Sequence, residues 1–167
     1  MPRPDFSSVR TDFPRASTAA YFDNASSHPL SVHSAAALHR YVDWVTHDVG
    51  DPWWPAWAGS RDDSKTLFAQ LINADPAEIS HARSTVESES NVLNGMAHHL
   101  AGGNVVTNDL SFSANLYNYK MREQAGLDVR VVPHRDWQID MNAMEQAIDA
   151  DTRLVSVALV SNVNGFV

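Results

Sequence analysis

The chain has 167 residues, of which 12 are Lys or Arg and 20 are Asp or Glu, so its net charge at pH 7 is −8 with His neutral. An acidic chain without a basic stripe is a poor candidate for binding nucleic acid or anionic lipid, and no apolar run here is long enough to cross a membrane. The absence of Cys excludes disulfides, thiolate metal ligands and a nucleophilic Cys on these residues. The polar, proline-broken start lacks the apolar segment of a secretory signal, so we expect a cytoplasmic protein.

The first half of the chain is predicted to be an arm followed by two helices. Residues 1–20 are expected to form an irregular arm, and Tyr21–Pro29 an extended piece that breaks into a polar loop. Apolar residues at helical spacing predict one helix over Ser31–Thr46 and a second over Asp62–Asn73. Residues 48–60, rich in Gly, Pro and Trp, are predicted to be a loop between these helices.

Three tryptophans of this predicted loop, Trp53, Trp54 and Trp57, leave two interpretations open. Exposed tryptophans in a loop are typical of an interface or a ligand wall. The alternative is that they anchor a long loop to the core.

The second half alternates strands with helices. Strands are predicted near residues 79–82, 104–107 and 128–132 and from 152 onward, and helices near 85–100, 114–125 and 141–150. Such an order predicts crossover connections and an α/β fold with a mainly parallel sheet flanked by helices.

The last strand runs into the polar turn Ser161–Gly165. The nearly unbroken apolar run Leu154–Val160 is typical of a parallel strand covered on both faces. A turn at the carboxyl end of such a strand is where open α/β sheets bind ligands, so Asn162 is either a turn former or a ligand contact. Because the sequence stops two residues after Gly165, we expect part of this site to lie outside it.

The segment Ser84–Glu87 follows a predicted strand and opens a predicted helix. Its spacing fits a capping box, in which Ser84 caps the Glu87 amide and Glu87 reaches back. It also fits an anion site, since free amides at a helix start favour phosphate. The two interpretations are compatible.

Other side chains are less specific. Phe112 is either a core aromatic or, at the carboxyl edge of the sheet, a ring on which a planar ligand stacks. Eight His residues are present, but none has the spacing of a metal-binding motif, so we expect no metal site.

Five segments carry a resemblance to a known family: YFDNASSHPLS, ARSTVESESNVL, NVVTNDLSFSANL, AGLDVRVVPHRDWQIDMNAMEQAI and DTRLVSVALVSNVNG. In this order and spacing, from about Phe13 onward, the chain resembles the N-terminal half of the large domain of class V aminotransferase-type enzymes. This fold type I family, dependent on pyridoxal 5′-phosphate, includes cysteine desulfurases, selenocysteine lyases and isopenicillin N epimerase-like proteins. The resemblance implies that residues 21–167 form an incomplete cofactor-binding domain and that the protein is a homodimer.

The resemblance also implies roles for single residues. The loop that binds the cofactor phosphate would be Ser84, Thr85 and Val86. The pyridine ring of the cofactor would stack on Phe112, where desulfurases have a His, and Asn162 would contact the ring hydroxyl and lie near the substrate carboxylate. Asn24 and Ala25 would line the substrate side.

Val86 stands where many relatives have a second Thr, which removes one side-chain contact to the phosphate. The family's catalytic lysine and its aspartate are expected beyond Val167, because neither Lys65 nor Lys120 follows a strand in the required turn. The implied function is transformation of an amino acid or amine by transamination, elimination or epimerisation. Two alternatives are a cysteine desulfurase or selenocysteine lyase, and a non-catalytic binding or assembly module. Because Phe112 cannot move a proton, we expect poor desulfurase activity.

Overall fold

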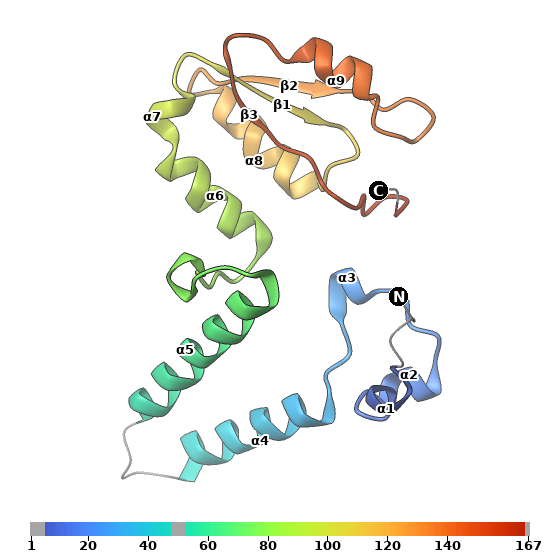
Figure 1. Ribbon diagram of the computed structural model, residues 1–167, viewed down its shortest axis with the longest axis vertical. Helices are drawn as coiled ribbons and strands as arrows, with labels where there is room; N and C mark the ends of the chain where they lie inside the picture. The colour runs from blue at the N-terminus through green and yellow to red at the C-terminus, as the bar shows by residue number, and fades with distance from the viewer. Residues whose placement is uncertain (1–5, 48–52, 166–167) are drawn as a thin grey trace. The chain divides into compact units, whose positions relative to one another are not determined.

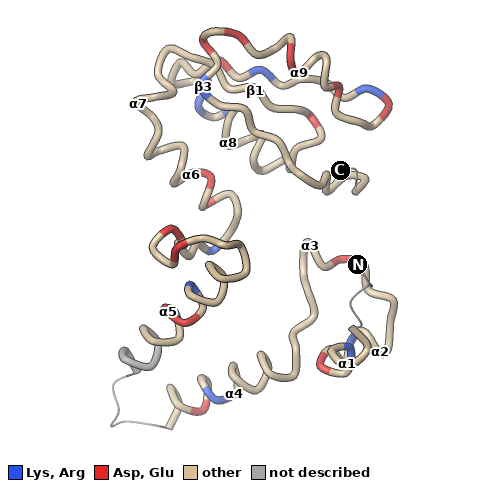
Figure 2. The backbone as a smooth tube through the Cα atoms, viewed as in Figure 1, with Lys and Arg blue, Asp and Glu red and all other residues tan. Residues whose placement is uncertain are grey.

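The computed structural model describes residues 6–47 and 53–165, except for the side chains of residues 53–57. Contacts divide the chain into two compact units, Met1–Ile79 and Ser80–Val167. Figure 1 shows the helical first unit and the sheet of the second. Charged residues of both signs are spread along both units (Figure 2). No helix among the described residues is long and apolar enough to span a bilayer.

The first unit consists of helices. They are α1 (Ser7–Arg10), α2 (Pro14–Thr18), α3 (Asn24–Ser27), α4 (Val32–His47), α5 (Trp53–Ile72) and the 3-10 turn η1 (Pro76–Glu78). The predicted helix over Ser31–Thr46 is confirmed as α4. The predicted polar loop after Tyr21 contains one helical turn, α3.

The predicted loop over residues 48–60 is wrong from Trp53 onward, where α5 begins. Pro55 does not prevent this, because it lies in the first turn, whose amides have no partner within a helix. The side chains of Trp53, Trp54 and Trp57 lie outside the described part of the structure, so their two interpretations stay open.

The second unit contains the sheet. Its elements are α6 (Thr85–Gly95), α7 (Ala97–Leu100), β1 (Asn104–Asn108), α8 (Ser113–Glu123), β2 (Asp128–Val132), α9 (Met141–Ala147) and β3 (Thr152–Val155). The strands are parallel in the order β2-β1-β3, which confirms the predicted α/β fold class. The predicted strand at residues 79–82 is wrong: Ile79 is the C-cap of η1, and the residues after it are irregular.

The central strand β1 is buried along its whole length, and successive side chains point to opposite faces of the sheet. On one face, Val105 packs in a cluster with Leu93 and Tyr119, which belong to α6 and α8. On the other face, Val106 packs with Val132 and with Met144 of α9. The sheet is therefore covered on both faces, with α8 and α9 on opposite sides (Figure 1).

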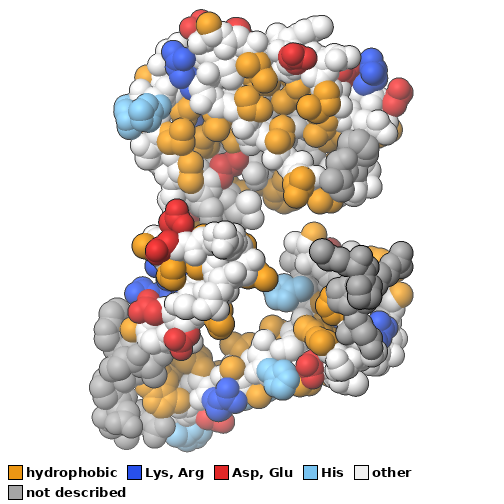
Figure 3. Space-filling view, in the orientation of Figure 1, with side chains coloured by type: hydrophobic (Ala, Val, Ile, Leu, Met, Phe, Trp, Pro, Cys, Tyr) orange, Lys and Arg blue, Asp and Glu red, His pale blue; other side chains and the backbone are white. Residues whose placement is uncertain are grey.

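The prediction that the last strand is covered on both faces is wrong for the described residues. In β3, Leu154 is half-buried but Val155 is exposed, and beyond the strand the exposed fraction of Leu159 reaches 81%. β3 is an edge strand, and beyond Ser156, whose amide still donates to the Val106 carbonyl of β1 at 2.9 Å, the chain is irregular. The apolar run alone therefore did not predict how much of this segment is covered. Hydrophobic side chains are visible on this face of the second unit in Figure 3.

Candidate functional site

The loops after β1 and β2 are joined at the carboxyl edge of the sheet. The Asp109 amide donates to the Val132 carbonyl at 3.1 Å. One Asp109 carboxylate oxygen accepts from the His134 amide at 2.8 Å, and the other lies 2.9 Å from His134 Nδ1. Asp109 therefore fixes the start of the loop that leads from β1 to Phe112.

Ser161 brings the turn after β3 to the same edge. It is buried, and its hydroxyl donates to the Leu110 carbonyl at 3.4 Å while accepting from the Val163 amide at 3.2 Å. The next residue, Asn162, is exposed. The structure thus places Asn162 and Phe112 on neighbouring segments, since Phe112 follows Leu110 by two residues.

Helices α6 and α8 lie side by side with a constant offset of 28 residues. Ser90 Oγ donates to Asn118 Oδ1 at 3.3 Å, and Arg122 Nη2 donates to Asn94 Oδ1 at 2.8 Å. In both pairs the residue on α8 is numbered 28 higher than its partner on α6, and the second pair lies four residues further along each helix. The two helices therefore run in the same direction, and residues 28 apart lie at the same height along the pair.

This offset relates two residues that the sequence analysis singled out separately. The N-caps of α6 and α8 are Ser84 and Phe112, which are also 28 residues apart. They therefore lie level at the same end of the helix pair. Because α8 connects the parallel strands β1 and β2, its first turn lies at the carboxyl edge of the sheet. The start of α6 lies on that side as well.

The start of α6 combines a cap with free donors. Ser84 Oγ accepts from the Glu87 amide at 3.2 Å, as predicted, but Glu87 Oε2 accepts from the Arg83 amide at 2.6 Å, one residue earlier than a capping box requires. The Arg83 guanidinium and amide hold the pKa of Glu87 below its usual value. Within the described residues, the amides of Thr85 and Val86 have no hydrogen-bond partner.

A ligand with a flat ring and a phosphate ester group could be held at this end of the helix pair. The two free amides and the helix dipole would bind the phosphate, and the negative charge of Glu87 is balanced by Arg83. Phe112 is 50% exposed, so its ring could stack on a planar ligand.

Two amide side chains that flank Phe112 along the chain, at the end of β1 and in the first turn of α8, had no role predicted from the sequence. Asn108 Nδ2 and Asn115 Oδ1 are buried atoms without a partner within the described part of the chain. In the sequence they are marked only by their positions: one amide side chain ends a strand, and the other lies in the first turn of α8.

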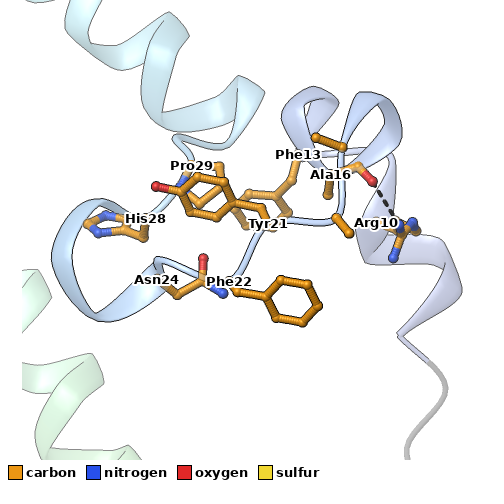
Figure 4. Close-up of a pocket in the computed structure, with 10 residues that line it drawn as sticks. Arg10, Phe13, Ala16, Tyr21, Phe22, Asn24, His28 and Pro29 are labelled. Atoms are coloured by element: carbon orange, nitrogen blue, oxygen red, sulfur yellow. Dashed lines mark hydrogen bonds between the residues drawn. The ribbon is translucent and has the colours of Figure 1, made fainter. Parts of the chain in front are cut away.

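Asn24 and Ala25 belong to the first unit, and their position relative to the other predicted site residues is not defined. They form the start of α3 rather than a loop. Asn24 lines a hollow of about 690 Å³ together with Arg10, Phe13, Tyr21 and His28 (Figure 4). Arg10 is held there by a hydrogen bond from Nη2 to the Ala16 carbonyl at 2.7 Å.

Comparison with known proteins gave several matches. The family model described as aminotransferase class-V matches residues 25–167. A cysteine desulfurase of Dickeya dadantii is 32% identical over 95% of this chain, and an uncharacterized aminotransferase of Schizosaccharomyces pombe is 25% identical over 84% of it. The chain spans only 42% and 35%, respectively, of the lengths of these two relatives.

Solved structures match as well. The apo structure of a cysteine desulfurase from Thermococcus onnurineus superposes with a TM-score of 0.73 at 23% identity, covering 93% of this chain and 40% of that one. A structure of a C-DES mutant with glycine covalently linked to its pyridoxal phosphate cofactor has a TM-score of 0.71 at 18% identity, with 93% and 40% covered. These similarities concern the fold.

Proposed function

Because the chain belongs to the class-V aminotransferase family, we propose that the protein binds pyridoxal 5′-phosphate and transforms an amino acid or amine with it. When bound, this cofactor supplies an electron sink for carbanionic chemistry at the substrate carbon. Residues 21–167 would contribute part of the cofactor-binding domain, and residues 1–20 an arm. The observation that carries the proposal is the level arrangement of the Ser84 and Phe112 caps.

The residues of this chain would bind and orient the cofactor. The amides of Thr85 and Val86 would donate to its phosphate, and the Ser84 hydroxyl would lie beside them. Phe112 would stack on its ring and fix the plane of the ring, but this side chain has no proton to transfer. Asn162, held at the same edge by Ser161, would donate to the ring hydroxyl and lie near the substrate carboxylate.

The substrate side is proposed to include Asn24 and Ala25. Asn24 lines a hollow that is mainly apolar and aromatic and carries Arg10 and His28. Such a lining suits an amino acid, which presents a carboxylate and an apolar body.

A second candidate function is cysteine desulfurization. It is favoured by the names of several relatives and of one solved structure, which are cysteine desulfurases. It is disfavoured by Phe112, which provides no general acid or base beside the ring. Sulfide release from L-cysteine distinguishes the two candidates.

We also propose that the protein is a cytoplasmic homodimer. In the first unit, no residue of α4 is buried, and Leu38, Tyr41, Val42 and Val45 are more than half exposed. Exposed apolar side chains on one helix face are typical of a surface that a partner covers.

The substitution Thr85→Pro tests the phosphate contact. It removes one proposed donor at the first helical position, where proline is tolerated, and Ser84 already has the extended backbone that precedes proline. Loss of a hydrogen bond to a charged group predicts roughly 10- to 100-fold weaker binding of pyridoxal phosphate by the full-length protein.

The matched control is Met141→Pro, at the first position of α9 after the extended Asp140. This variant should keep the affinity of the unmodified protein in an equilibrium titration. Unchanged affinity in Thr85→Pro, or an equal loss in both variants, would contradict the phosphate assignment. Absence of binding by the unmodified full-length protein would refute the cofactor itself.

A further inference from the structure

We infer that Glu89 is a positioning residue, which sets the register between α6 and α8 and thereby the spacing between the phosphate-binding turn and Phe112. The inference rests on the proposed function, because it assigns Glu89 a role in the same cofactor site. Glu89 itself would touch neither cofactor nor substrate.

Each carboxylate oxygen of Glu89 accepts a hydrogen bond from α8. Tyr119 Oη donates to Oε1 at 2.5 Å, and Asn118 Nδ2 donates to Oε2 at 3.3 Å. Tyr119 and Asn118 are buried, with exposed fractions of 2% and 8%. Because both oxygens of this carboxylate are hydrogen-bonded to buried donors on α8, α6 can slide little along α8.

The position of this contact along the helices matters. Glu89 lies five residues after the Ser84 cap, and Tyr119 lies seven residues after the Phe112 cap. At about 1.5 Å of rise per residue, both are within about two turns of the proposed site. The bond between Arg122 and Asn94 lies farther toward the carboxyl ends of both helices.

Without Glu89, the helix pair would still be held by the bond between Ser90 and Asn118, by that between Arg122 and Asn94, and by the packing of Leu93. On α6 these three contacts all lie farther from the Ser84 cap than Glu89 does. The Ser84 end of α6 could then shift against the Phe112 end of α8. A ligand that contacts both caps would bind less tightly, whereas the affinity for a ligand that contacts only the start of α6 would be unaffected by the shift.

Two ligands separate positioning from simple electrostatics. Inorganic phosphate uses only the amides at the start of α6, but pyridoxal phosphate needs both the amides and the Phe112 ring. The carboxylate of Glu89 repels anions, so its removal alone favours phosphate binding or leaves it unchanged. A positioning role predicts the opposite sign for pyridoxal phosphate.

The experiment titrates both ligands into the full-length protein, its Glu89→Gln and Tyr119→Phe variants, and the control Asn94→Ala. We expect Glu89→Gln and Tyr119→Phe each to weaken pyridoxal phosphate binding about tenfold, with phosphate affinity equal to or above that of the unmodified protein. The visible circular dichroism of the bound chromophore, which reports the orientation of its ring, should fall in both variants. Asn94→Ala removes one inter-helix bond at the far end and should keep both the affinity and the signal.

Other outcomes decide against the inference. Equal losses for both ligands, in proportion to a lower melting temperature, would mean that Glu89 only stabilises the fold. Unchanged pyridoxal phosphate binding and dichroism in Glu89→Gln would also overturn the inference while leaving the proposed function intact. Failure of the unmodified protein to bind pyridoxal phosphate would overturn both.

Discussion

Arg130 and Asp149 form an ion pair at the amino edge of the sheet, opposite the candidate site, with Arg130 Nη1 2.6 Å from Asp149 Oδ2. The other Asp149 oxygen accepts from Asn104 Nδ2 at 2.9 Å. Asn104 in turn accepts from the Thr152 hydroxyl at 2.8 Å. One carboxylate therefore ties β2, β1 and β3 together where the three strands begin.

This arrangement predicts an acid-sensitive contribution to stability. The Arg130 guanidinium, followed by the Asn104 amide, lowers the pKa of Asp149 from 3.8 to about 2. Because the folded pKa is the lower one, the contribution is present above pH 3.8 and is lost as the pH falls toward 2. We expect Asp149→Asn to flatten the dependence of the unfolding free energy on pH in that interval.

Urea denaturation at a series of pH values measures this slope. Arg130→Gln should flatten it in the same way, and the double variant should add little to either single change, since both remove one interaction. A slope as steep in Asp149→Asn as in the unmodified protein would show that other carboxylates dominate acid unfolding.

The sequence predicted the second unit better than the first. The limits of β2 were predicted correctly because the alternating segment Asp128–Val132 is bounded by Gly126 and Pro133, which both interrupt regular structure. The start of α5 was missed because Pro55 suggests a break, although a proline in the first turn costs a helix no hydrogen bond. Local pattern was sufficient in one case and misleading in the other.

The candidate site was only partly predictable. Ser84 was identified because capping depends on spacing along the chain, and the predicted bond to the Glu87 amide is present. The level positions of Ser84 and Phe112 depend on bonds such as that between Ser90 and Asn118, which join residues far apart in sequence. No periodicity in either helix contains that information.

The reaction type depends on Phe112, and the substitution Phe112→His tests it. We expect little sulfide release from L-cysteine by the full-length protein, because a phenyl ring transfers no proton. Histidine at this position restores a general acid or base, an effect typically worth about 10²- to 10⁴-fold. Sulfide production should therefore rise in Phe112→His and stay low in Phe112→Leu, which lacks the aromatic ring. Desulfurase-like turnover in the unmodified protein would overturn this assignment.

The dimer proposal predicts that a charge on the apolar face of α4 weakens self-association. Val42 is 55% exposed, and Val42→Glu would place a carboxylate on that face, where burial without a partner is costly. We expect sedimentation of the full-length protein to shift toward the monomer. Arg40 lies on the opposite side of the helix, so Arg40→Ala should leave the sedimentation unchanged. A Val42→Glu variant that sediments like the unmodified protein would exclude this face as the dimer contact.

Gly103, immediately before β1, is predicted to tolerate no side chain. It is buried, and a Cβ atom there would lie 2.6 Å from the Asp151 carbonyl oxygen and 2.4 Å from Arg153 Cγ. The Arg153 side chain can move, but the Asp151 carbonyl cannot move freely because it accepts from the Asn104 amide at 3.0 Å. Gly103→Ala must therefore displace the start of β3 from β1, and we expect a loss of roughly 1–3 kcal/mol in the free energy of unfolding.

Gly95→Ala is the matched control for this substitution. Gly95 ends α6, and a Cβ atom there would meet no heavy atom within 4 Å. Because alanine restricts the unfolded chain and favours the helix, this variant should gain about 0.4–1 kcal/mol. Urea midpoints of the two variants should thus move in opposite directions from that of the unmodified protein. A Gly103→Ala variant as stable as Gly95→Ala would show that the approach of Asp151 to Gly103 is not a constraint on the sheet.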